Sequence, residues 1–508
     1  MHEICTSYSH KKQRYLHWFK MKRYQDLIEQ TFEFPTREFN FENGSLQFNN
    51  VPLMEIVKQY GTPLKLTYLP KITEHIEHAK MLFRNAMKKY AYKGSYTYCY
   101  CTKSSHFSFV LDEALKNNIH LETSSAFDIG IIRNLEEAGK ITKNTYVICN
   151  GYKRPLYLEN ITKMLNDGFV NCVPVLDNLK EIDYYIENAT EAEAVNVGIR
   201  IATDEEPNFA FYTSRLGVRY NDIVPLFKDK IRPNPRFKLK MLHFFINAGI
   251  KDNAYYWSEL TRFMFKYCEM KKICPDLDSI DIGGGLPIQT SLVFNYDYQA
   301  MIDEIIENIQ WICGKNNVPV PHIFTEFGSY TVGESGAVIY KIIDKKQQND
   351  RELWYMIDGS FITQLPDAWG INQKYIMMPV NNWDLPYEKV NLGGLTCDSQ
   401  DFYNNEAHSE DLYLPAFDIE TEDQYVGFFH TGAYQESLGG YGGIQHCLIP
   451  APQHVLIQQD EDGNLVTELF APEQGAESMM KILGYKNSSE TKVFAPIPKS
   501  KKKEIEVV

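Results

Sequence analysis

The chain has 508 residues and a formal net charge of -14 at pH 7. Its length exceeds what one hydrophobic core usually fills, so we expect two domains. Hydrophobic residues at 44% and charged residues at 23% exclude disordered and fibrous classes, and the negative charge argues against nucleic acid or an anionic membrane as a partner.

The N-terminal part is polar at first and then becomes strand-like. Residues 1–20 are basic and lack the apolar run of a secretory signal, so we expect a disordered extension there. Residues 21–90 are expected to form an N-terminal segment that partly joins a β domain, because SLQFNN (45–50) and PLKLTYL (63–69) resemble strands. The histidines of HIEH (75–78) have no third ligand nearby, so no metal is expected.

Residues 91–335 alternate short apolar runs with amphipathic stretches of helical period. The eight runs are 96–102, 119–124, 145–150, 172–177, 195–201, 240–247, 279–283 and 322–328. Eight parallel strands with intervening helices in about 250 residues predict an α/β fold with a TIM-like (β/α)8 barrel. An open doubly wound sheet is the alternative, but no GxGxxG motif follows any run.

After residue 335 the pattern changes to alternating runs such as AVIYKII, LWYMID and QYVGFFHTG. These runs predict a C-terminal antiparallel β-sandwich or β-barrel domain over residues 336–485. Residues 486–508 mix charges of both signs without a period, which indicates a flexible tail. No apolar stretch is long enough to span a bilayer, and no CxxC pair occurs among the cysteines, which favours a soluble, cytoplasmic protein with reduced thiols.

Lys103 ends the first predicted barrel strand, at the edge where barrels of this kind carry their catalytic groups. Alternation places Cys99, Cys101 and Lys103 on one face, and this small face is expected to be the inner one. Apolar surroundings there would lower the pKa of Lys103 and make a neutral, imine-forming amine accessible. Taken alone, a lysine at this position is more commonly a strand-end amine that reaches water.

Two further strand ends carry residues suited to a phosphorylated cofactor. Gly283, Gly284 and Gly285 follow the seventh strand, and such a run lets backbone N–H groups approach a phosphate, although a tight turn explains it equally well. Glu326 ends the eighth strand, where a carboxylate can pair with a protonated ring nitrogen. A lone glutamate is more commonly solvated or salt-bridged.

The loop GGLTCDSQD (393–401) of the β domain places a thiol, carboxylates and a hydroxyl together. Cys397 can donate a proton, and Asp398 or Asp401 can hold a cationic group. The alternative is an ordinary Asp/Ser turn with an incidental cysteine.

In combination, these residues resemble the pyridoxal-phosphate enzymes of the alanine racemase and ornithine/diaminopimelate decarboxylase fold, known as fold type III. The resemblance covers roughly residues 50–485. Within that group the chain is most similar to the biosynthetic arginine decarboxylases, judged by LETSSAFDI (121–129), CNGYK (149–153), LPDAWGINQ (365–373), LTCDS (395–399) and GAYQE (432–436).

The resemblance implies a role for each selected residue. Pyridoxal 5'-phosphate would be attached to Lys103, with Glu326 on its ring nitrogen. The other implied cofactor contacts are His243 and Phe245 at the ring, Gly283, Gly284, Gly285 and Tyr434 at the phosphate, and Gly328 beside Glu326. Cys397 would donate a proton across a homodimer interface, and Asp398 or Asp401 would bind the cationic end of the substrate.

The implied activity is decarboxylation of L-arginine to agmatine and CO₂, a step of polyamine biosynthesis. The same chemistry on ornithine, lysine or diaminopimelate is an alternative, as is a homologue without catalytic activity. The Cys-Asp pair favours a substrate with a cationic end over diaminopimelate, whose distal carboxylate would require an arginine.

Three positions depart from the family pattern. They are Phe245 in place of a histidine, Asn247-Ala248 in place of Gly-Ser, and Ser329 in place of an arginine that neutralises phosphate charge. Arg200, Arg215 or Arg219 would have to supply the missing cation.

Overall fold

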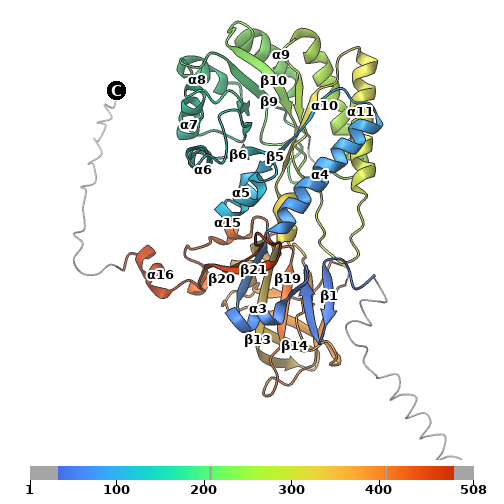
Figure 1. Ribbon diagram of the computed structural model, residues 1–508, viewed down its shortest axis with the longest axis vertical. Helices are drawn as coiled ribbons and strands as arrows, with labels where there is room; N and C mark the ends of the chain where they lie inside the picture. The colour runs from blue at the N-terminus through green and yellow to red at the C-terminus, as the bar shows by residue number, and fades with distance from the viewer. Residues whose placement is uncertain (1–32, 205–208, 408, 486–508) are drawn as a thin grey trace, which may run out of the picture.

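The computed structural model describes residues 33–204, 209–407 and 409–485. The expectations for residues 1–20 and 486–508 lie outside this range. Figure 1 shows a barrel with its helices at the top and a second, β-rich part below it. None of the helices in the described range combines the length and apolar character that crossing a membrane requires.

Eight parallel strands close into a barrel in the order β5 to β12 and back to β5, which confirms the predicted fold class. Their bounds are β5 (Tyr96–Cys101), β6 (His120–Thr123), β7 (Val147–Cys149), β8 (Cys172–Leu176), β9 (Val195–Arg200), β10 (Phe237–His243), β11 (Ser279–Asp281) and β12 (His322–Phe327). The largest difference from prediction is β10, which ends at His243 although apolar residues continue to Ile246. Phe245 therefore lies after the strand.

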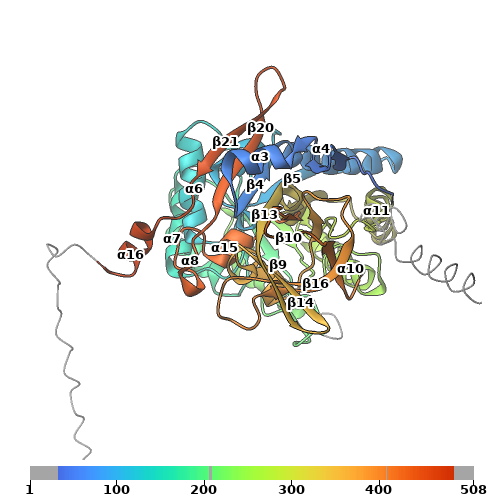
Figure 2. The same cartoon turned by 90° about the horizontal axis from the view of Figure 1, so that it is seen from below.

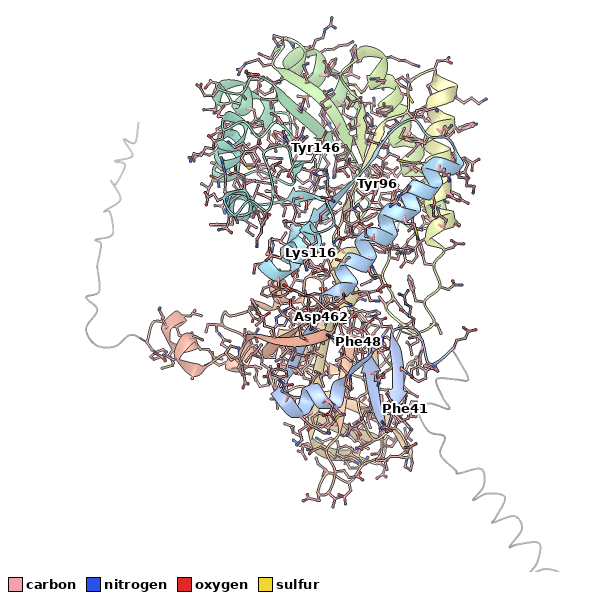
Figure 3. All side chains as sticks on the ribbon, in the orientation of Figure 1. Phe41, Phe48, Tyr96, Lys116, Tyr146 and Asp462 are labelled. Atoms are coloured by element: carbon pink, nitrogen blue, oxygen red, sulfur yellow. The ribbon has the colours of Figure 1, made fainter. Side chains whose placement is uncertain are left out.

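The strands alternate as expected between the barrel interior and the surrounding helices. Cys99 packs inside the barrel with Val173, Met241 and their neighbours. Tyr98 and Tyr100 belong instead to the larger core between strands and helices. Figure 3 labels Tyr96 and Tyr146 in the barrel.

Helices surround the barrel on its outer side (Figure 1). They are α4 (Pro70–Lys89), α5 (Ser108–Leu115), α6 (Ala126–Glu137), α7 (Pro155–Asn166), α8 (Glu181–Asn188), α9 (Ile223–Leu226), α10 (Ala254–Ile273), α11 (Tyr298–Asn316) and the short α12 (Ser329–Val332). At the start of α6, the Ser125 hydroxyl accepts the Asp128 N–H in a reciprocal capping box. This cap fixes the turn that leads out of β6.

The second part is a ten-stranded sheet with a three-stranded sheet beside it. The large sheet contains β4 (Leu64–Tyr68), β13 (Gly336–Asn349), β14 (Glu352–Ile357), β15 (Ile376–Pro379), β16 (Tyr387–Gly393), β17 (Phe402–Tyr403), β18 (Leu412–Pro415), β19 (Tyr425–Phe429), β20 (Gln453–Gln459) and β21 (Leu465–Ala471). The small sheet contains β1 (Phe39–Glu42), β2 (Ser45–Phe48) and β3 (Val51–Pro52). Short helices α3 (Leu53–Tyr60), α13 (Phe361–Gln364), α14 (Pro366–Gly370), α15 (Gln435–Gly439) and α16 (Ala476–Ile482) accompany them.

The large sheet is mixed rather than purely antiparallel, because β14 pairs with β16, and β20 with β4, in parallel. Strand β4 precedes the barrel in the chain and lies between β13 and β20 (Figure 2). A segment from before the barrel therefore completes the sheet that follows it.

The β domain meets the barrel at the C-terminal ends of its strands. The Tyr434 N–H donates to the Ser104 carbonyl at 2.8 Å, just after β5. His430 Nδ1 donates to the Gln289 carbonyl at 2.6 Å, beyond β11. Residues of the β domain therefore lie next to the C-terminal ends of the barrel strands.

Candidate active site

Buried charge distinguishes the two ends of the barrel. A cavity of about 370 Å³ opens at the N-terminal end, where Lys240 and Asp278 form a partly exposed ion pair of 2.9 Å. The C-terminal end instead gathers buried polar side chains from most of the strand ends. They are Glu122, Asn150, Asp177, His243, Asp281 and Glu326.

Lys103 lies in the 3-10 turn η1 (Thr102–Ser104) that follows β5. Its Nζ is 2.6 Å from Cys101 Sγ and 3.0 Å from Glu122 Oε2. Glu122, fully buried at the end of β6, also accepts the Cys101 thiol at 2.8 Å. The Lys103 side chain is 43% exposed. It therefore lies at the edge of the buried polar cluster at the C-terminal end of the barrel, which is called the mouth below.

The pKa of Lys103 contradicts the expectation of a lowered value. Burial disfavours the ammonium, but Cys101 and the carboxylates of Glu122 and Glu326 outweigh it and raise this pKa well above its ordinary value. The expectation assumed apolar surroundings, whereas β6 and β12 bring carboxylates to the amine. Lys103 must therefore release a proton before it can act as a nucleophile.

Asn150, just after β7, joins the two carboxylates of the mouth. Its Nδ2 donates to Glu326 Oε1 at 2.6 Å and to Glu122 Oε1 at 3.1 Å. Neither Asn150 nor Glu122 was assigned a role from the sequence, although both lie in stretches that carry the family resemblance. The usable signal was a polar side chain at the end of an otherwise apolar inner strand.

Glu326 ends β12 and is held as an anion. Its Oε2 lies 3.1 Å from His243 Nε2. Burial alone would raise the pKa of Glu326, but His243, Lys103 and a hydrogen bond with Asp281 lower it to about 2. Burial next to Glu326 raises the pKa of Asp281 well above its usual range. Of the two carboxyl groups, Glu326 is therefore the one that ionises first, and Asp281 holds its proton more strongly.

The three glycines after β11 pack too tightly for any side chain. A Cβ on Gly284 would lie 2.4 Å from the Glu326 carbonyl oxygen, and one on Gly285 would lie 2.7 Å from Gly249 Cα. Gly283 and Gly285 also adopt φ of 68° and 95°, which L side chains rarely tolerate. Within the described range, no hydrogen bond uses the N–H of Gly284 or Gly285. These N–H groups are left to bind an anion.

Gly328 and Tyr434 shape the region beside Lys103. A Cβ on Gly328 would lie 3.0 Å from Ser104 Cβ and 3.2 Å from Cys101 Cβ, so glycine lets η1 pack against the end of β12. The Tyr434 side chain forms a hydrogen bond with Ser329, at the position where the family pattern has arginine. Burial raises the pKa of Tyr434 to about 12, which keeps its hydroxyl neutral.

Arg200, at the end of β9, is a cation that packs against Phe245, the residue whose ring also contacts the glycine turn. Its guanidinium carbon lies 5.6 Å from the centre of the Phe245 ring, and a Cβ on Gly283 would lie 3.1 Å from that ring. Arg200 Nε is buried and has no hydrogen-bond partner among the described residues. Arg215 is exposed, and Arg219 is engaged in an exposed ion pair of 2.7 Å.

Cys397 and Asp398 lie outside this cluster. Both are exposed; Cys397 Sγ lies 3.4 Å from Cys447 Sγ, and Asp398 Oδ1 accepts the Gln400 N–H at 2.8 Å. No hydrogen bond or ion pair between described residues joins the loop 393–401 to the barrel mouth. Within one chain, the structure gives no contact between Cys397 and Lys103.

Asp401 is occupied by hydrogen bonds from its own loop and from the start of α13. Its Oδ1 accepts the Phe361 N–H at 2.8 Å, and its Oδ2 accepts the Thr396 N–H and hydroxyl at 3.1 and 2.7 Å. The side chain is buried. Asp398 is therefore the carboxylate of this loop that remains available to a ligand.

Comparison with known proteins gives a consistent family. The pyridoxal binding domain of the pyridoxal-dependent decarboxylases matches residues 73–333, which include all eight barrel strands. The biosynthetic arginine decarboxylase of Prochlorococcus marinus is 23% identical over 87% of this chain and 86% of its own. That of Proteus mirabilis is 23% identical over 82% and 84%.

Solved structures share the fold. The biosynthetic arginine decarboxylase of Campylobacter jejuni aligns with a TM-score of 0.75 and 20% identity over 89% of both chains. Diaminopimelate decarboxylase of M. jannaschii, in complex with L-lysine, aligns with a TM-score of 0.72 and 16% identity over 87% of this chain and 96% of its own.

Proposed function

This chain belongs to the pyridoxal-dependent decarboxylases, and on that premise we propose that it converts L-arginine to agmatine and CO₂. The observation that carries the proposal is the meeting of Lys103, the Glu326 anion and a glycine turn at one end of the barrel. The substrate is supported by similarity along most of the chain to relatives named biosynthetic arginine decarboxylase.

The residues of the mouth fit pyridoxal 5'-phosphate. The glycine turn offers the N–H groups of Gly284 and Gly285, and the unpartnered Nε of Arg200 offers a cation for a phosphate. We propose that Arg200 replaces the arginine that is absent at Ser329. Tyr434 adds a neutral hydroxyl beside Ser329.

Bound pyridoxal phosphate supplies an electron-withdrawing ring that stabilises the negative charge left on the α-carbon when CO₂ departs. Lys103 is the amine that would hold the cofactor. Glu326 stays ionised because His243 and Lys103 lower its pKa to about 2, so it can keep a ring nitrogen protonated. His243 orients the Glu326 carboxylate, and Phe245 offers an apolar face to the ring.

We propose that Cys397 protonates the α-carbon and that Asp398 binds the guanidinium of the substrate. Both residues are exposed and lack contacts with the mouth of their own chain. A homodimer in which each β domain completes the site of the other subunit would bring them to Lys103. A carboxylate suits a guanidinium because it accepts two parallel N–H donors.

The remaining assignments are a cytoplasmic location and a place in polyamine synthesis. The described cysteines are all free thiols, which suits a reducing compartment. The net charge of -14 favours attraction of a cationic substrate over an anionic one.

Two measurements test this function. The purified protein should show the visible absorption band of bound pyridoxal phosphate, and Lys103→Ala should abolish it. CO₂ release should then be compared for arginine, ornithine, lysine and diaminopimelate. A colourless protein that does not bind added cofactor would refute the proposed decarboxylase activity. Release of CO₂ from ornithine but not from arginine would refute the assignment of arginine as the substrate.

A further inference from the structure

Cys397 has two neighbours that the proposed reaction does not use. Its Sγ lies 3.4 Å from Cys447 Sγ and 3.8 Å from His446 Nε2. The three atoms all lie within 4.8 Å of one another. His446 and Cys447 come from the short turn η5 (His446–Leu448), so two segments about 50 residues apart in the chain meet here.

Both sulfurs of this cluster are exposed, which sets them apart from the other described cysteines. Of nine described cysteines, seven are buried, and the two exposed ones are Cys397 and Cys447. Their separation of 3.4 Å is well beyond the about 2.0 Å of a disulfide, so both are thiols that can take a ligand.

The spacing matches a tetrahedral zinc ion. With Zn–S of about 2.3 Å and Zn–N of about 2.0 Å, two sulfurs of such a site lie ~3.8 Å apart, and a sulfur and a nitrogen lie ~3.5 Å apart. The observed 3.4 Å and 3.8 Å differ from these values by a few tenths of an ångström. We propose that Cys397, His446 and Cys447 form a three-ligand zinc site.

The donor set points to zinc rather than to a hard cation. Two thiolates and an imidazole are soft or borderline ligands, whereas Mg²⁺ and Ca²⁺ prefer oxygen. Three protein ligands leave a fourth position for water or for a group of an incoming molecule. The site is formed by one chain, although the proposed dimer would place it beside the partner's barrel mouth.

Zinc binding changes what Cys397 can do. Two thiols become thiolates, both protons pass to solvent, and the imidazole binds in its neutral form. A zinc-bound thiolate has no proton to give to the α-carbon. Zinc is therefore expected to inhibit decarboxylation reversibly; this consequence rests on the proposed function, whereas the binding itself does not.

The binding test uses Co²⁺ as a coloured substitute for zinc on the holoenzyme, reduced with a phosphine that does not chelate metals. Wild type should develop thiolate-to-cobalt absorption together with the visible bands of a tetrahedral ion. Cys447→Ser should lose this absorption, His446→Ala should weaken it, and His322→Ala, which removes an exposed histidine at the other end of the barrel, should retain it. Excess Zn²⁺ should bleach the signal.

The inhibition test measures CO₂ release against Zn²⁺ concentration. Residues that only hydrogen-bond to the ligands of a metal change its affinity by about 10–100-fold. Cys447→Ser removes a ligand itself, so it should raise the half-inhibitory Zn²⁺ concentration by more than about 100-fold. The proposal is overturned if reduced wild type gives no thiolate–cobalt absorption, or if Cys447→Ser gives the same absorption. A cobalt signal in a protein that does not turn over arginine would leave the zinc site standing and refute the proposed function alone.

Discussion

Glu122 holds Lys103 as an ammonium ion, since its Oε2 lies 3.0 Å from Nζ at the end of the neighbouring strand. Replacing this carboxylate by an amide removes one of the charges that raise the pKa of Lys103. We expect Glu122→Gln to move the pH dependence of cofactor binding to lower pH, because the amine of Lys103 loses its proton more readily without this carboxylate. The rate at which the visible absorption appears, measured against pH, checks this.

Glu181→Gln is the matched control, because Glu181 is another buried acid that pairs with a lysine, Lys153, at 3.0 Å. It should leave the pH profile of cofactor binding in place. If Glu122→Gln gives the wild-type profile as well, the assigned cause of the high pKa of Lys103 is wrong.

The barrel was predictable because local sequence determines it. Each strand is a short apolar run bounded by turn residues, and Lys103 stands out only because its strand is followed by seven more. The end of β10 was misplaced, since Phe244 and Ile246 are as buried as strand residues and no local signal separates them. The contact between Lys103 and Glu122 joins the ends of two different strands. Neither this contact nor its effect on the pKa of Lys103 could therefore be predicted from the sequence of one strand.

Arg200 should contribute to binding the cofactor's phosphate. We expect Arg200→Gln to weaken pyridoxal 5'-phosphate by about 10- to 100-fold, the range for a lost charge-assisted hydrogen bond, and to leave the affinity for unphosphorylated pyridoxal nearly unchanged. Absorption titrations with both compounds measure the two affinities. Arg219→Gln, which removes an exposed arginine, should change neither. Equal losses for both compounds would show that Arg200 supports the fold rather than the phosphate.

Two inactive variants should restore activity to each other if the site is shared between subunits. Lys103→Ala and Cys397→Ala each remove one contribution, and a mixed dimer would contain one complete site. Random pairing makes half the dimers mixed with one working site each, so about a quarter of wild-type CO₂ release is expected after co-expression. Cys397→Ala alone should keep the cofactor absorption. No recovery in a mixture shown to contain mixed dimers would place both residues in a site formed by one chain.

Asp398 and its neighbour Asp401 are expected to differ in effect. Asp398 is exposed, so Asp398→Asn should raise the KM for arginine by about 10-fold or more with little effect on stability, as expected for a lost charge-assisted contact. Asp401 accepts hydrogen bonds from Phe361 and Thr396, so Asp401→Asn should lower the unfolding midpoint. Steady-state kinetics and thermal unfolding separate the two effects. An unchanged KM in Asp398→Asn would show that another group binds the guanidinium.

His430 forms a buried ion pair at the junction of the two domains. Its Nε2 donates to Glu38 Oε2 at 3.0 Å, and its Nδ1 donates to the Gln289 carbonyl at 2.6 Å. Burial alone would lower the pKa of His430, but Glu38, Glu334 and this carbonyl raise it to about 9. Lys71 lies 3.5 Å from the other oxygen of Glu38, and its pKa is also raised because Glu38 and Glu74 outweigh burial.

The raised pKa of His430 predicts a loss of stability in alkali. An unfolded histidine titrates near pH 6.5, so the contribution is fully present below that pH and is lost as pH rises through about 9. The expected loss is on the order of 3 kcal/mol, measured by urea unfolding of the cofactor-free protein between pH 6 and 10. His430→Gln should be less stable at pH 6 and should lack this slope, so the two curves should converge near pH 10. Parallel curves would show that His430 is neutral in the folded protein, with Glu38 neutralised by Lys71 instead.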